Sequence, residues 1–209
     1  MGRDSGSFAR KKAKYKQIPT VLVVCEDTKS NKKYIEDAAL YYRANVDVLV
    51  QHCGNTDPLG IVEYAISESR KYDVVFCAID RDSHHNFDAA IHKAKTNPKI
   101  NIIDSHPCFE FWYLLHFGYK DKPYARAGKK SPADLLIKDL MSIKFFADYD
   151  KGKSTSLFES LLGEPFETAL NVSPKVLANA RETGNLNPST KVHELINHIR
   201  SIKSLKPAE

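Results

Sequence analysis

Strand-like and helix-like patterns of apolar residues alternate along residues 18–117. This alternation narrows the possible folds more than any other feature of the sequence. Apolar runs of strand type are each followed by a segment whose apolar residues recur at helical spacing. Repeated strand–helix units are typical of a mostly parallel sheet with helices on both faces. We therefore expect an α/β domain over residues 18–117. The strand-like runs are Ile18–Cys25, Val46–Val50, Val74–Ile79 and Lys99–Ile103, and the helical segments are Asn31–Tyr42, Asp57 to about Lys71, Phe87–Lys95 and Cys108–Phe117.

The pattern changes after Gly118. Three segments there have helical spacing and begin at a serine, a residue that favours the first position of a helix: Ser131–Met141, Ser154–Leu162 and Ser189–Ile202. No strand-like run competes with them. We expect residues 118–209 to form a helical C-terminal region.

Residues 1–17 are a basic segment with a composition of their own. Up to Lys16, six cationic side chains stand against Asp4 alone, so this arm carries the whole formal net charge of +5. A basic arm on a neutral body is typical of a flexible phosphate-binding tail, whose nucleic-acid binding is salt-sensitive and independent of base sequence. A tail that only aids solubility is the alternative. The candidate nucleic-acid-binding residues are Arg10, Lys11, Lys12, Lys14 and Lys16.

The sequence gives no sign of a membrane segment or of metal-binding cysteines. Its apolar runs fall well short of the roughly 18 residues that cross a bilayer, and its N-terminal basic residues precede no apolar signal region. We expect a cytoplasmic protein that does not associate with a membrane. The four cysteines include no C-x-x-C pair, so we expect reduced core residues. They are Cys25, Cys53, Cys77 and Cys108.

Acidic residues follow two of the expected strands. Glu26 comes directly after Ile18–Cys25, and Asp80 and Asp82 end the run that starts at Val74. Ligand sites of open parallel sheets lie outside the carboxyl ends of the strands, and residues two apart in an extended chain point to the same side. Carboxylates held so close repel each other, and a hard cation such as Mg²⁺, or Mn²⁺, would relieve that repulsion. The sequence therefore predicts a metal site at Glu26, Asp80 and Asp82, with a helix cap as the alternative role for Asp82.

Other polar residues could complete this site. Glu110 falls in the first turn of an expected helix, where it could join the metal site or simply favour the helix dipole. Either His84 or His85 could contact a scissile phosphate or donate a proton, although exposed loop histidines commonly have no such role. The Lys129–Lys130 and Lys151–Lys153 clusters could contact phosphates, but solvated surface is their expected place.

Four segments together resemble the RloB-like proteins. They are VLVVCEDTKSNKKYI around Glu26, VVFCAIDRDSHHNF around Asp80 and Asp82, HPCFEFWYLLHF at residues 106–117, and NPSTKVHELI from Asn187. Proteins of this family are encoded beside restriction and phage-defence genes and are related to the AbiL abortive-infection components. The resemblance covers nearly the whole chain and implies a Toprim-like (Rossmannoid) core.

The resemblance implies roles for the three acids. In Toprim domains the glutamate after the first strand acts in acid–base chemistry and the Asp-x-Asp pair holds the metal, which here are Glu26, Asp80 and Asp82. One departure concerns the turn that follows. Nucleotidyl-transferring Toprim enzymes have a glycine close after the glutamate, where this chain has Asp27, Thr28 and Lys29. Glycine would permit close approach of the backbone to a phosphate, and this chain lacks that feature.

We expect a metal-dependent nuclease that hydrolyses phosphodiester bonds in anti-phage defence. Metal at Asp80 and Asp82 would neutralise charge on phosphorus and activate a water, with Glu26 as a further ligand or general base. The sequence favours neither DNA nor an RNA such as tRNA, since it has no RNA-binding or helix-turn-helix signature. Receiver and haloacid-type phosphatase folds place their acids after the first strand, which argues against both. A non-catalytic Toprim-like adaptor that binds nucleic acid or an ATPase is the remaining alternative.

Control by a partner is expected because the chain has no P-loop with which to gate itself by ATP. The resemblance implies an ATPase of the RloA/AbiLi type. The region after Gly118 adds nothing to the predicted acid cluster, so we expect it to supply the docking surface, with Ser189–Glu209 as part of it.

Overall fold

The computed structural model describes residues 18–81, 84–151 and 157–205. Its sheet has five strands in the order β2-β1-β3-β4-β5. The first four strands are parallel, and β5 pairs antiparallel with β4. The expected mostly parallel α/β sheet is confirmed. The strands are β1 (Val21–Cys25), β2 (Val48–Gln51), β3 (Val74–Asp80), β4 (Ile100–His106) and β5 (Ser189–Thr190).

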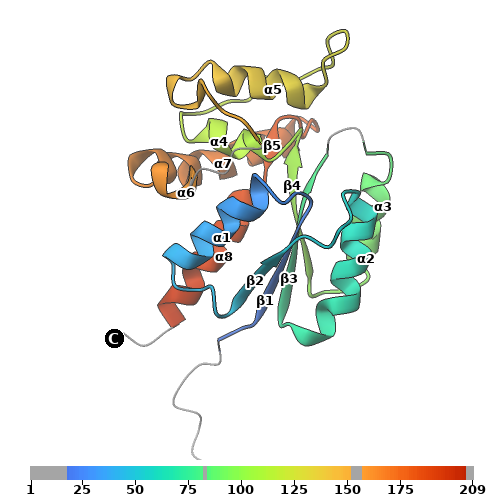
Figure 1. Ribbon diagram of the computed structural model, residues 1–209. Coiled ribbons are helices and arrows are strands. Elements are labelled where there is room, and N and C mark those ends of the chain that lie inside the picture. Colours follow the sequence, from blue (N-terminus) through green and yellow to red (C-terminus); the bar gives the residue numbers. More distant parts are fainter. Residues whose placement is uncertain (1–17, 82–83, 152–156, 206–209) are drawn as a thin grey trace, which may run out of the picture.

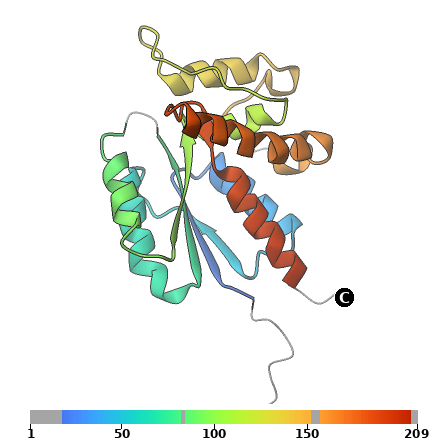
Figure 2. The same cartoon turned by 180° about the vertical axis from the view of Figure 1, so that it is seen from behind.

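Helices cover both faces of the sheet (Figures 1 and 2). One face packs against α1 (Asn31–Tyr41) and α8 (Val192–Leu205), the other against α2 (Pro58–Glu68) and α3 (Phe87–Ala94). Side chains of a strand alternate between its two faces, so β1 contributes to two buried clusters. Every residue of β1 is fully buried, which explains its continuous apolar sequence.

The predicted helix starts at Asp57 and Ser131 are confirmed. The Asp57 carboxylate accepts a hydrogen bond from the Gly60 N–H at 2.9 Å, and Pro58 stands at the first helical position of α2. The Ser131 hydroxyl accepts from the Asp134 N–H, and the Asp134 carboxylate accepts from the Ser131 N–H in return. This reciprocal capping box starts α5 (Pro132–Met141).

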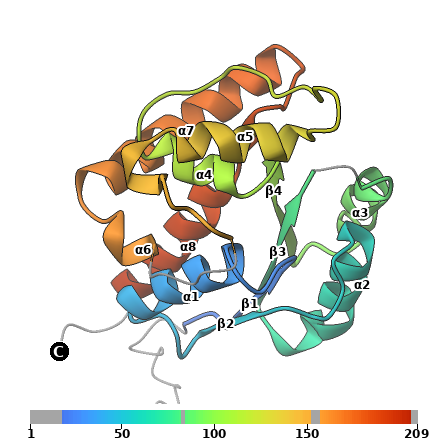
Figure 3. The ribbon, with the colours of Figure 1, turned by 45° about the horizontal axis from the view of Figure 1, so that its top comes forward.

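Four helices gather at the end of the sheet toward which the parallel strands run (Figures 1 and 3). They are α4 (Glu110–Leu115), α5, α6 (Leu157–Ser160) and α7 (Glu164–Glu182), and short 3-10 helices occupy Ser69–Lys71 and Lys144–Phe146. The sequence analysis missed α7, which contains Pro174 within its length. A proline there removes one backbone hydrogen bond and normally argues against a helix. Packing of the buried α7 face, from Phe166 to Ala180, overrides that local preference.

The C-terminal part differs from the expectation of helices alone. Ser189 and Thr190 form β5, paired with His106 and Ser105 of β4. The apolar stripe of α8 lies in the core, with no exposure at any of its five aliphatic residues, so this stripe is not available for docking. The reason is that β5 brings the chain alongside β4 and directs α8 across the sheet. The stripe consists of Val192, Leu195, Ile196, Ile199 and Ile202.

The cysteine prediction agrees with the structure. Cys25, Cys77 and Cys108 are buried thiols, and Cys53 is partly buried. No disulfide joins them. In the described ranges, none of the helices is both long and apolar enough to span a bilayer.

Candidate acidic site at the carboxyl edge of the sheet

Glu26 and Asp80 lie at the point where the strand order reverses. The chain passes from β1 to β2 on one side and then crosses back to β3 on the other side of β1. In sheets of this type, ligands bind in the crevice at such a switch point. The Asp80 N–H donates a hydrogen bond of 2.7 Å to Glu26 Oε2, so the two predicted site residues are in direct contact.

The environment of these two acids disfavours their charged forms. Asp80 is only 7% exposed, and burial, with the charges of Glu26 and Glu110, raises its pKa well above the ordinary value. Burial also raises the pKa of Glu26, although the Asp80 N–H and His84 act against this shift. The His84 Nε2 atom lies 3.2 Å from Glu26 Oε1. The described surroundings therefore favour the protonated forms of both acids.

Glu110 extends the acid cluster from the start of α4. It is fully buried, and its Oε1 atom accepts a hydrogen bond of 3.0 Å from the Tyr149 hydroxyl. The Oε2 atom is buried without a hydrogen-bond partner among the described residues. A buried carboxylate oxygen without a donor is costly unless a ligand satisfies it. Glu110 thus joins the cluster, as the sequence allowed.

Lys151 and Asp27 belong to the site, and the sequence analysis assigned neither to it. The Lys151 Nζ atom lies 3.3 Å from Asp27 Oδ2 and 3.3 Å from Glu110 Oε1, so this exposed lysine is also an ion-pair partner of the site. Together with Tyr149, it brings the region after Gly118 into the acid cluster, contrary to expectation. No local signal marks such a contact, because it depends on how α4 and the chain before α6 pack together.

Asp27 also accounts for the turn that lacks a glycine. Its Oδ1 atom accepts hydrogen bonds of 2.9 Å from the N–H groups of both Lys29 and Ser30. Burial opposes ionisation of Asp27, but Lys151 and these hydrogen bonds hold its pKa below the ordinary value. The turn after β1 is therefore fixed by a side chain.

Several predicted residues lie outside the described residues. They are Asp82, Lys153 of the lysine cluster, Ser154 at the expected start of a helix, and the whole basic arm, including Arg10, Lys11, Lys12, Lys14 and Lys16. His85 is exposed, as are Lys129 and Lys130. Within residues 18–81, 84–151 and 157–205, no three His, Cys, Asp or Glu side chains are grouped so that they could hold a metal ion. Two members of the predicted metal set, Glu26 and Asp80, do meet.

The carboxylate oxygens of Glu26 and Asp80 are of the type that Mg²⁺ and Mn²⁺ prefer, but the described side chains alone do not assemble a three-ligand metal site. The Glu110 Oε2 atom has no hydrogen-bond donor among the described residues. Cysteine is no alternative ligand, since burial holds the pKa of the Cys108 thiol well above its ordinary value.

A second acid cluster lies beside the first, on the other face of the sheet. Asp80 pairs with Ser105 of β4, and Asp104 is the residue before Ser105. Because successive side chains of a strand point to opposite faces of the sheet, the side chains of Asp80 and Asp104 lie on opposite faces. The His106 Nε2 atom lies 2.8 Å from Asp104 Oδ2, and the Lys191 Nζ atom lies 2.6 Å from Oδ1. Burial alone would raise the pKa of Asp104, but His106 and Lys191 lower it to about 2. This second carboxylate is fully neutralised.

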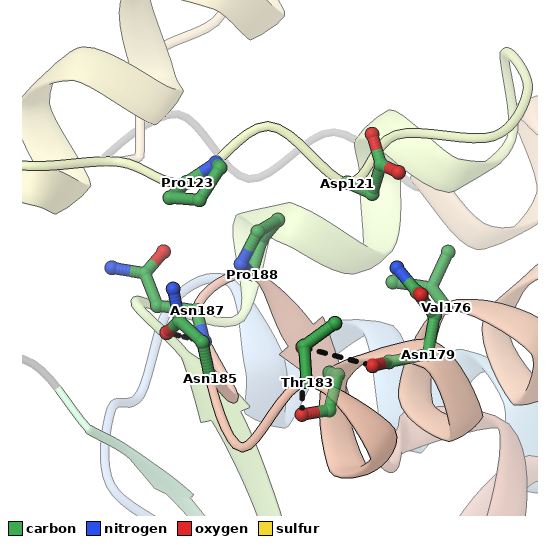
Figure 4. Close-up of a pocket in the computed structure, with 9 residues that line it drawn as sticks. Asp121, Pro123, Val176, Asn179, Thr183, Asn185, Asn187 and Pro188 are labelled. Atoms are coloured by element: carbon green, nitrogen blue, oxygen red, sulfur yellow. Dashed lines mark hydrogen bonds between the residues drawn. The ribbon is translucent and has the colours of Figure 1, made fainter.

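A small pocket of about 190 Å³ lies at the end of α7 (Figure 4). Asn179 of α7 and Thr183, the residue that follows this helix, stand on one side, and Asp121 and Pro123 face them across the opening. Its lining includes none of the acids that follow β1 and β3. The pocket is therefore separate from the acid cluster.

Comparison with known proteins gives a family but no close relative. A protein-family model described as RloB-like protein matches residues 21–199. No curated protein and no solved structure matches the chain. The matched span runs from β1 into α8 and includes Glu26, Asp80, Glu110 and Lys151.

Proposed function

The chain belongs to the RloB-like protein family, and we propose that it is a Mg²⁺- or Mn²⁺-dependent nuclease with a Toprim-like core. The observation that carries this proposal is the hydrogen bond of 2.7 Å from the Asp80 N–H to Glu26 Oε2, which brings two acids with raised pKa values together at the switch point. A strongly raised pKa at the switch point of a parallel sheet supports a functional site more than a structural one.

The reaction we propose is hydrolysis of a phosphodiester bond. When bound at Asp80, with Asp82 as the further ligand that the sequence predicts, the cation would neutralise charge on phosphorus and acidify a water. Glu26 takes a proton from the attacking water, for which its raised pKa makes it a better base than an ordinary glutamate. The new P–O bond forms as the bond to the leaving oxygen breaks.

His84 serves two purposes in this scheme. Its contact with Glu26 orients the carboxylate, and it is the described imidazole that lies beside that carboxylate. It can therefore supply the proton that the leaving oxygen requires. Glu110 completes the negative cluster from the α4 side, and its partnerless Oε2 atom is available to the cation or to a metal-bound water.

The cellular role that we propose is that of a cytoplasmic effector in anti-phage defence or abortive infection. The resemblance of the four sequence segments to a family encoded beside defence genes supports this role. The chain has no P-loop, so we propose control by an ATPase of the RloA/AbiLi type. Deleting Ser189–Glu209 would remove α8 from the core, so association is better tested by copurification of the full chain with the ATPase.

The basic arm is proposed to hold the nucleic acid through its phosphates. Removing residues 1–16 deletes six cations, and the salt slope of binding to DNA should fall by about 0.9 for each phosphate that the arm no longer neutralises. Equal slopes for the shortened and full chains would show that the arm does not bind phosphate.

Calorimetry and cleavage assays together test the proposed function. Wild-type protein and Asp80→Ala are titrated with Mg²⁺ and Mn²⁺ and then incubated with duplex DNA, single-stranded DNA and tRNA, each with cation or EDTA. We expect cation binding and cleavage by the wild type alone. Binding of nucleic acid without cation uptake or cleavage would favour the alternative, a non-catalytic adaptor.

A further inference from the structure

We propose that the Lys151 ammonium is a built-in counter-ion of the acid cluster, and that a divalent cation must displace it to bind there. The inference concerns the regulation of the site described above and rests on the proposed metal dependence. It assigns Lys151 as a positioning residue that sets the affinity of the site for cations.

The position of Lys151 is the first argument. Its Nζ atom lies 3.3 Å from an Asp27 oxygen and 3.3 Å from a Glu110 oxygen. These two carboxylates come from different elements, the turn after β1 and the start of α4. A single ammonium thus bridges them at the place where the sheet edge meets the helices above it.

The charge balance is the second argument. Glu26, Asp27, Asp80 and Glu110 gather here, and Lys151 is the cation that pairs with two of them. An ammonium within 3.3 Å of two carboxylates lowers the negative potential that a metal ion would experience there.

The mobility of a lysine side chain makes displacement feasible. The ammonium sits on a flexible four-carbon stem, and 41% of the Lys151 side chain is exposed. It can leave for solvent without breaking the core. A divalent cation supplies twice the charge, so it would neutralise the gathered carboxylates more completely than the ammonium does.

Calorimetric titration of the metal-free full chain with Mn²⁺ tests the proposal. Lys151→Met removes the ammonium and keeps most of the apolar stem, so we expect Mn²⁺ to bind about tenfold tighter, a conservative figure for one unit charge at this range. Lys151→Arg keeps the charge and should bind about as weakly as the wild type. Lys191→Met is the matched control, because it removes one lysine charge from the neutralised Asp104 cluster and should change the affinity less than about twofold.

Thermal melts without metal provide an independent measurement. We expect Lys151→Met to melt below the wild type, and Glu110→Gln in the same chain to recover part of that loss, since the glutamine needs no counter-ion. Additive effects of the two substitutions would overturn the counter-ion role.

The two failures can be told apart. If Lys151→Met binds Mn²⁺ no tighter than the wild type does, displacement is wrong while the proposed metal centre stands. If neither protein takes up Mn²⁺, both displacement and the metal-dependent function are overturned.

Discussion

Asp80 and Asp104 are two aspartates of similar burial on neighbouring strands, with opposite surroundings. Asp80 is 7% exposed and Asp104 is 5% exposed. The charge of Asp104 is matched by Lys191 and His106, which lower its pKa to about 2. Asp80 instead adjoins Glu26 and Glu110, and its pKa is raised. Burial alone therefore does not identify a functional acid, because the charged groups around a buried carboxylate decide whether its pKa is raised or lowered.

The two clusters also serve different parts of the fold. Lys191 holds Asp104 twice, through its ammonium and through a backbone N–H bond of 3.1 Å to the Asp104 carbonyl. These two contacts hold β5 and the start of α8 against the sheet. Asp80 accepts a backbone hydrogen bond from Phe109, but burial and two neighbouring carboxylates still raise its pKa. A buried acid with a raised pKa is more typical of functional sites than of purely structural ones.

The largest expected difference between the clusters is in catalysis. Asp80→Asn should lower Mg²⁺-dependent cleavage by at least about 100-fold, because a lost metal ligand costs several kcal/mol of transition-state stabilisation. Asp104→Asn should leave the rate within about threefold when measured on folded protein below its melting temperature. Single-turnover cleavage rates of the two variants test this expectation. Equal losses of rate in both variants would show that the two clusters do not differ in their role in catalysis.

Stability should change in the opposite order. Asp104→Asn leaves Lys191 and His106 without their carboxylate and should cost about 3 kcal/mol, as expected when one partner of a buried ion pair is removed. Asp80→Asn relieves repulsion and should leave the metal-free protein as stable as the wild type or more so. Urea denaturation in EDTA measures both. A cooperative loss of fold in Asp80→Asn would make this residue structural.

The fold was largely predictable because it follows local patterns. Neighbouring residues alone predict strand runs such as Val74–Ile79 and the helix caps at Asp57 and Ser131, and the structure confirms them. Two features were not predictable in this way. The α7 helix contains Pro174, and β5 has only the two residues Ser189 and Thr190. Both depend on packing between parts distant in sequence.

The site residues also divide into those that local sequence predicts and those that depend on packing between distant parts of the chain. Glu26 and Asp80 could be found because strand ends meet at one edge of a parallel sheet. Asp27, Tyr149 and Lys151 could not, since a lone lysine or tyrosine in a loop gives no sign of the carboxylate it will meet. One signal was available for the second cluster. The Asp-x-His spacing of Asp104 and His106 on a strand places both side chains on one face.

The pH dependence of stability should show both clusters. The pKa of Asp104 falls from 3.8 to about 2 on folding, so its contribution is full above about pH 4 and is lost between about pH 4 and 2, a change of about 2 kcal/mol. The pKa of Asp80 rises on folding, so metal-free stability should increase as the pH falls from neutral toward 4.

Urea denaturation across pH 2–7 measures both limbs. Asp104→Asn should flatten the acidic limb alone, and Asp80→Asn the other limb alone. A wild-type curve that falls continuously from pH 7 would contradict the raised pKa of Asp80.

The smallest expected effect tests whether Glu110 shares the proposed metal-binding role of Glu26 and Asp80. Tyr149→Phe removes the hydroxyl that donates to Glu110 Oε1 and should cost about 1.5 kcal/mol in EDTA, a usual value for a hydrogen bond to a charged group. Tyr119→Phe, at a half-exposed tyrosine, is the control and should be neutral. If Glu110 helps to hold the cation, saturating Mn²⁺ takes over the neutralisation that Tyr149 provided, and the cost of Tyr149→Phe should shrink. An identical cost with Mn²⁺ and with EDTA would show that Glu110 belongs with Asp104 as a structural acid, and that the functional cluster ends at Glu26 and Asp80.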